Sequence, residues 1–119
     1  MRNFKNLDIW RMGFELSKMI YKITDKFPRD EVYGLTSQIR RAGVSIPSNI
    51  AEGCGRNTSK DFRNFLYNAL GSLREVETQI LIARDLNYLE NLEFKIIYEK
   101  IDELGAKLTN FAPNSSIFS

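Results

Sequence analysis

The sequence predicts an all-α protein, an up-and-down antiparallel four-helix bundle, on three observations. Apolar residues recur at spacings of three and four through four successive segments, which is the pattern of amphipathic helices. The segments are joined by short links, which favour antiparallel neighbours. No stretch alternates apolar and polar residues as a half-exposed strand would. We expect residues 1–112 to form this single bundle domain and residues 113–119 to form a flexible C-terminal tail.

The first helix is predicted to run to about Lys26, with Asn6 as its N-cap. One apolar stripe suits a bundle core and consists of Ile9, Leu16, Ile20, Ile23 and Phe27. A second stripe, formed by Trp10, Phe14 and Tyr21, exceeds what one core needs. Either the helix is wrapped between two neighbours, or the second stripe meets another subunit.

The second helix is predicted to begin near residue 34 and to contain Pro47. Proline lacks an N–H, and its ring crowds the carbonyl four residues back, so we expect a kink here or two shorter helices. Asn49 and Glu52 follow within two turns and are expected to satisfy backbone groups that the kink leaves unpaired. Gly53 and Gly55 are expected to stop the helix.

The third helix is predicted to begin after Thr58, whose side chain with Asp61 makes an imperfect capping box. It should end near Leu86, before a turn at Asn87. The fourth helix should start near residue 90, and its apolar positions repeat almost as a heptad seam: Phe94, Ile97, Ile101, Leu104, Leu108 and Phe111.

Charge is unevenly distributed along the chain, although the net charge is only +2. Basic residues dominate from Thr36 to Arg74, and acidic residues dominate from Glu75 onward. We expect five basic residues to cluster around one helix–loop–helix corner and to be the candidate nucleic-acid-binding residues: Arg40, Arg41, Arg56, Lys60 and Arg63.

The two adjacent arginines, Arg40 and Arg41, also have a structural interpretation. One of them could hold Glu52 or Asp61 of the same bundle, or a carboxylate across a subunit interface, because a guanidinium group suits bidentate contacts. Solvated or ion-paired arginines are the commoner case in proteins. The sequence leaves both interpretations open.

Catalytic chemistry has little support, so we do not expect an enzyme. The sequence contains no histidine, which excludes Ser-His-Asp and Cys-His nucleophile arrangements, and Cys54 therefore lacks a histidine partner. Glu75 and Glu77 lie two residues apart and point to different helix faces, so no metal site is expected, and no motif indicates a cofactor. A single cysteine and the lack of a membrane-spanning apolar run predict a cytoplasmic protein with no membrane partner.

The segment GLTSQIRRAGVSIPSNIAEGCGR, from Gly34 to Arg56, resembles the core signature of the bacterial four-helix bundle proteins named after the intervening sequences of 23S rRNA genes. FKNLDIW near the N-terminus and ALGSLREVETQILI from Ala69 to Ile82 extend the resemblance over nearly all of the chain. The resemblance implies a four-helix bundle and a homopentameric ring, like that of the related accessory protein of diversity-generating retroelements. It implies no biochemical activity, and it favours Trp10, Phe14 and Tyr21 as an oligomer interface.

We therefore expect a non-enzymatic homo-oligomer, a pentamer by the family resemblance, that offers a basic surface to RNA, DNA or a nucleic-acid-handling protein. The alternative is a structural or protein-binding adaptor with no affinity for nucleic acid. In that case the apolar faces carry the function, and the arginines belong to the subunit interface.

Overall fold

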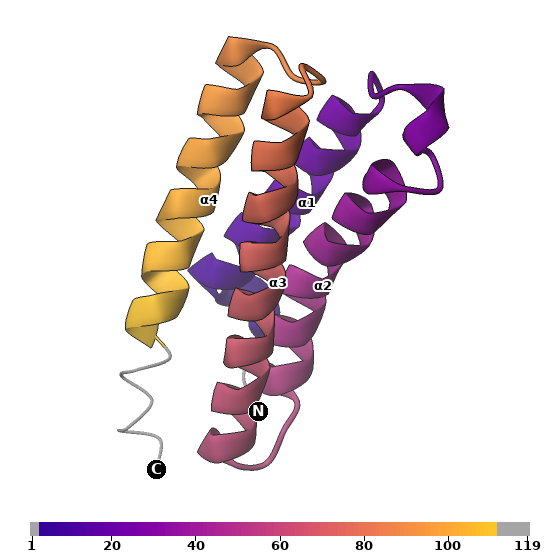
Figure 1. Cartoon of the computed structure of the whole chain (residues 1–119). Coiled ribbons are helices and arrows are strands. Elements are labelled where there is room, and N and C mark those ends of the chain that lie inside the picture. The colour runs from indigo at the N-terminus through magenta and orange to yellow at the C-terminus, as the bar shows by residue number, and fades with distance from the viewer. Residues whose placement is uncertain (1–2, 112–119) are drawn as a thin grey trace.

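The computed structural model describes residues 3–111, and these residues form four α-helices with no strand. The predicted all-α bundle is therefore confirmed (Figure 1). Two short 3₁₀ turns, η1 and η2, precede α1 and α2. In chain order the elements are η1 (Phe4–Asn6), α1 (Asp8–Thr24), η2 (Arg29–Glu31), α2 (Leu35–Cys54), α3 (Ser59–Asp85) and α4 (Asn91–Phe111).

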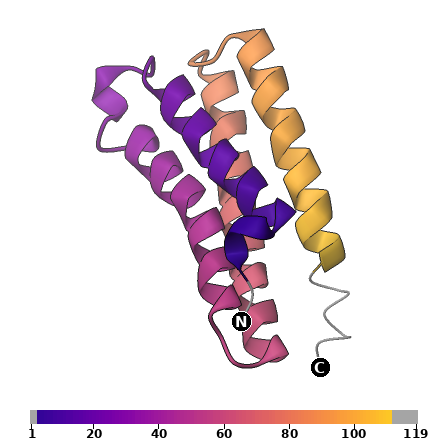
Figure 2. The same cartoon turned by 180° about the vertical axis from the view of Figure 1, so that it is seen from behind.

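Each helix packs against the helices that adjoin it in a square. α1 contacts α2 and α4, and α3 contacts the same two helices, so α1 and α3 are diagonally opposite. Figure 1 shows α3 in front of the bundle, and the reverse view in Figure 2 brings α1 to the front. The α2–α3 loop lies at the same end as the beginning of α1 and the end of α4. A surface on the outer face of α3 is consequently remote from one on α1.

The core is a column of aliphatic side chains contributed by all four helices. The apolar stripe predicted for the first helix is buried, and the heptad-like positions of the fourth are buried from Ile97 to Leu108. Burying a leucine or isoleucine side chain stabilises a fold by about 1.5–3 kcal/mol. The largest fully buried side chains include Leu16, Ile20, Ile39, Ile46, Ile50, Phe62, Leu66, Leu73, Ile80, Ile97, Ile101 and Leu104.

The ends of the helices follow local side-chain chemistry, with one correction. Thr58 caps α3 as predicted, because its hydroxyl accepts a hydrogen bond from the Asp61 N–H at 3.1 Å. Asn87 has a φ of 62° and turns the chain after α3. The predicted Asn6 cap is wrong: Asn6 is the last residue of η1, and its N–H is bonded to the Asn3 carbonyl. Leu7 occupies the N-cap position of α1 without a side-chain hydrogen bond.

Pro47 lies within one continuous helix, so the alternative of two shorter helices is wrong. The kink itself remains a prediction. Gly53 is also helical and buried, and it does not stop α2; the cap position is Gly55. A Cβ atom on Gly53 would lie 2.8 Å from the Cβ of Phe65, so the glycine lets α2 approach α3 closely. The predicted tail at 113–119 lies outside the described residues.

No helix within residues 3–111 is both long enough and apolar enough to cross a lipid bilayer.

Candidate nucleic-acid interface

Three of the five predicted basic residues surround the loop between α2 and α3, and we call Arg56, Lys60 and Arg63 the basic corner. Arg56 follows the end of α2, while Lys60 and Arg63 lie on the first turns of α3. Arg56 is held in place because its guanidinium pairs with Glu52 at 2.8 Å and stacks on the Phe65 ring at 4.7 Å. No carboxylate among residues 3–111 pairs with Lys60 or Arg63. Two cations of the corner are thus available to an anion.

Arg40 has a structural role at the C-terminal end of α1. Its Nε donates a hydrogen bond to the Thr24 hydroxyl at 2.8 Å, and its Nη2 donates to the Tyr21 carbonyl at 3.3 Å. The N–H of Asp25 bonds to Lys22, so the Tyr21 carbonyl lacks its usual helical donor. A cation at a helix C-terminus is also favoured by the macrodipole. Arg40 therefore ties α2 to the last turn of α1, and it is not a member of the basic corner.

Arg41 is exposed and is bonded to no carboxylate in the described part of the chain. It nevertheless lies far from the corner. Cys54 lies thirteen positions further along α2, which at 1.5 Å per residue is about 20 Å away. The prediction that all five basic residues cluster at one corner is wrong, because α2 is long and unbroken. Neither arginine pairs with Glu52 or Asp61. Glu52 pairs with Arg56 instead.

Asn49 and Glu52 lie on α2 beyond Pro47 but do different things. The Asn49 amide donates to the Ser45 carbonyl at 2.8 Å and to the Ser45 hydroxyl at 2.9 Å. Ser72 of α3 donates to the same hydroxyl at 2.9 Å, which links the two helices. Glu52 instead holds Arg56. Of these contacts, the hydrogen bond between Ser72 and Ser45 joins α2 to α3, while the Asn49 hydrogen bonds stay within α2.

The second apolar stripe of α1 remains on the surface. Trp10 stacks on Phe14 at 4.9 Å and meets Phe4 edge-on at 5.1 Å, while Phe14 is 42% exposed. Tyr21, 47% exposed, lies under the guanidinium of Arg40 at 4.6 Å. A groove of about 320 Å³, which we call the aromatic groove, runs between α1 and α2 and is lined by Trp10, Phe14, Ser17, Lys18, Val44, Pro47, Ser48 and Ala51.

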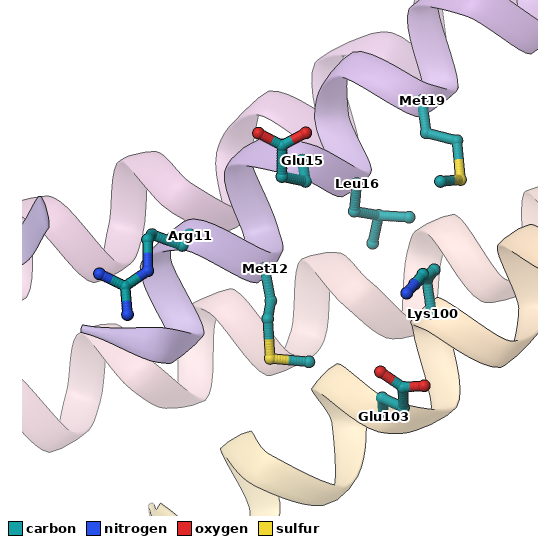
Figure 3. Close-up of a pocket in the computed structure, with 7 residues that line it drawn as sticks. All are labelled: Arg11, Met12, Glu15, Leu16, Met19, Lys100 and Glu103. Carbon is teal, nitrogen blue, oxygen red and sulfur yellow. The ribbon is translucent and has the colours of Figure 1, made fainter. Parts of the chain in front are cut away.

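A second hollow, of about 220 Å³, lies between α1 and α4 and is drawn in Figure 3. Its apolar floor consists of Met12, Leu16 and Met19, which point from α1 toward α4. Four charged residues of both signs surround this floor: Arg11, Glu15, Lys100 and Glu103.

Three carboxylates elsewhere have lowered pKa values, and each has a structural cause. The Leu35 N–H and then the Tyr88 hydroxyl lower the pKa of Glu31, which caps α2. The Tyr98 hydroxyl and then Arg74 lower the pKa of Glu77. The Lys26 ammonium lowers that of Glu93. Each shift favours the charged form in a contact that joins two parts of the fold.

Within residues 3–111 no three His, Cys, Asp or Glu side chains gather where they could hold a metal ion.

Tyr67 belongs with the basic corner but was not among the predicted residues. It lies four residues after Arg63 and seven after Lys60, so all three fall on one side of α3. That spacing was visible in the sequence. What the sequence could not show is that the ring is 48% exposed and faces away from the core.

The family model described as "23S rRNA-intervening sequence protein" matches residues 5–110. The chain belongs to that family. The resemblance stated from the sequence is thereby confirmed, while a relation to the accessory protein of diversity-generating retroelements remains a prediction.

Among solved structures, the chain is similar to a crystal structure from Bacteroides thetaiotaomicron VPI-5482, described as a protein with unknown function from the S23 ribosomal protein family. The two share 23% sequence identity with a TM-score of 0.79, over 87% of this chain and 97% of the other. At that identity the likeness establishes the fold alone. No curated protein matches the sequence. The comparisons thus establish the family and the fold of this chain.

Proposed function

We propose that this family member is a non-enzymatic, homo-oligomeric bundle that binds nucleic acid through the basic corner. The observation that carries the proposal is the pair Lys60 and Arg63, which lies on an outward surface beside Arg56 without a carboxylate partner among residues 3–111. Unpaired cations attract phosphates by releasing condensed counterions, so binding should weaken steeply with salt. Ring symmetry would repeat this small patch and increase its effect.

Oligomerisation is the second part of the proposal, and the aromatic groove supports it. Trp10, Phe14 and Val44 form a contiguous apolar surface that other copies of the chain could cover. The pentameric number rests on the resemblance to the accessory protein of diversity-generating retroelements. The single cysteine supports a cytoplasmic location, because no disulfide can form within the chain.

The nucleic-acid part is tested by titrating labelled RNA and DNA at two salt concentrations. The double variant Lys60→Gln and Arg63→Gln should lose most of the affinity and show a smaller salt slope, since each lost phosphate contact reduces that slope by nearly one. Lys22→Gln with Lys95→Gln is the matched control, because it removes the same charge from exposed positions at the other end of the bundle. Equal losses in both double variants, or no binding by the wild type at low salt, would contradict the proposal.

The oligomeric part is tested by light scattering coupled to size-exclusion chromatography. A pentamer has about five times the 13.8 kDa chain mass. Phe14→Glu should yield smaller species, because it places a charge on the exposed aromatic groove without cutting into the core. Tyr33→Glu is the control, since that ring is 93% exposed and lies in the α1–α2 link outside the groove. A monomeric wild type at micromolar concentration would refute the oligomer.

The adaptor remains a second candidate because the aromatic groove and the basic corner are separate surfaces. The groove lies between α1 and α2, whereas Lys60 and Arg63 lie on α3, diagonally opposite α1. A protein that assembles normally yet binds neither RNA nor DNA would favour the adaptor. Arg40 cannot serve in this distinction, because its loss would disturb the α1–α2 contact itself.

A further inference from the structure

The outer face of α3 carries a row of polar and aromatic residues that extends the basic corner along the helix. Lys60, Arg63, Asn64, Tyr67 and Gly71 follow the three-and-four spacing of one helix face. The opposite face of the same helix is fully buried and contains Phe62, Leu66, Ala69 and Leu73. The row is exposed except at Arg63, which is half-buried at its edge, and the aromatic ring lies one turn beyond the cations at the start of α3.

Tyr67 differs from the other tyrosines of helices α1, α3 and α4 and of the α3–α4 link. The hydroxyls of Tyr88 and Tyr98 donate to Glu31 and Glu77, and Tyr21 lies beneath a guanidinium. Tyr67 is 48% exposed, and within residues 3–111 neither a ring contact nor a hydrogen bond engages it. Its ring and hydroxyl are both available to a ligand.

The surface next to this ring is open. A Cβ atom built on Gly71, one turn further along α3, would have no neighbouring atom within 4 Å. A glycine at an exposed helical position costs about 1 kcal/mol relative to alanine, and no packing contact within the described chain requires it here. The space above Gly71 is therefore open to a planar group that lies against Tyr67.

Cations beside an exposed aromatic ring are the chemistry of single-strand recognition. Phosphates pair with Lys and Arg, while an unpaired base stacks on an aromatic face. Bases in a duplex are already stacked on each other and cannot reach such a ring without being extruded. We propose that the outer face of α3 binds single-stranded nucleic acid, with Lys60 and Arg63 on phosphates and Tyr67 stacked on a base. This inference rests on the proposed function and names the class of its ligand.

The test compares single-stranded RNA and DNA 12-mers with duplexes of the same sequence, by fluorescence anisotropy at low salt. Wild type should prefer the single strands. Tyr67→Leu should weaken single-strand binding roughly 5- to 150-fold, the range expected for losing one stacked base, and leave duplex binding unchanged. Tyr67→Phe should keep the affinity, since the ring is retained. Tyr33→Leu is the matched control, because it removes an exposed tyrosine away from the row.

Four results would overturn the inference. Equal binding of single strands and duplexes, or full affinity in Tyr67→Leu, would refute single-strand stacking while leaving the proposed function intact. A change of oligomeric mass in Tyr67→Leu would assign the ring to a subunit contact. If wild type binds neither form at low salt, the proposed function and this inference both fail, so the two kinds of failure are distinguishable.

Discussion

Helix α1 packs on its two neighbours in different ways. The α1–α2 contact contains Gly13 and Ser17 of α1. Gly43 and Pro47 of α2 lie opposite them, so the two backbones approach closely. A Cβ atom on Gly13 would lie 3.4 Å from the Pro47 nitrogen, and one on Gly43 would lie 2.7 Å from the Ile20 Cδ1. A larger side chain would not fit at Gly13 or Gly43, although the aromatic groove lies between the same two helices.

The contact of α1 with α4 is made by longer side chains instead, and a hollow lies within it. Flexible Met12 and Met19 line the hollow of about 220 Å³ shown in Figure 3. Ion pairs lie along the same contact: Lys107 reaches Asp8 at 3.4 Å, and Lys26 reaches Glu93 at 2.5 Å. Helix α1 therefore meets α2 through small residues at close backbone distance, and it meets α4 through long side chains and ion pairs.

The largest expected effect comes from filling the α1–α2 contact. Gly43→Val should lower the free energy of unfolding by about 3 kcal/mol, because Ile20 is fully buried and has no free space into which to move. Gly71→Val places the same side chain where nothing lies within 4 Å and should change stability little. Urea unfolding of both variants gives the comparison. Equal losses would show that helix propensity, rather than close packing, dominates.

An intermediate effect is expected from the two adjacent arginines. Arg40→Ala should cost about 1.5 kcal/mol, because it removes charge-assisted hydrogen bonds to the Thr24 hydroxyl and the Tyr21 carbonyl at the end of α1. Arg41→Ala should change stability by less than about 0.5 kcal/mol, since the residue is exposed and unpaired in the described chain. Thermal unfolding of the two variants measures the difference. A similar loss in both would contradict the structural role assigned to Arg40.

The smallest effect concerns the ion pair in the α1–α4 contact. The hydrogen bond from Lys26 holds the pKa of Glu93 below its ordinary value of 4.5. The stabilisation is therefore present above pH 4.5 and is lost as the pH falls through the lower, folded-state value. Lys26→Met should lower Tm slightly at neutral pH, and the difference from wild type should vanish in acid. Lys95→Met is the control, because it breaks no ion pair within residues 3–111. If the Tm difference between Lys26→Met and wild type persisted in acid, this explanation would be wrong.

The candidate nucleic-acid-binding residues were predicted only in part from the sequence. Lys60 and Arg63 were predicted correctly as neighbours, because only three residues of one helix separate them. Arg40 and Arg41 were grouped with them wrongly. They are near in sequence, but the long unbroken α2 keeps them far from the α2–α3 loop in space. Tyr67 was missed although its spacing from Arg63 could be read, because its exposure depends on how α3 is rotated in the bundle.

By itself the sequence determined the four helices, the buried stripe of each and the Thr58 cap, because helix periodicity and capping are local properties. It also identified the family, through motifs that run along nearly the whole chain. The tertiary structure decided which partner each polar group takes. Gly53 lies against Phe65 of α3, Ser45 accepts a hydrogen bond from Ser72 of α3, and Arg40 bonds to the end of α1. Each contact is made with another helix, whose rotation and distance are fixed only by packing.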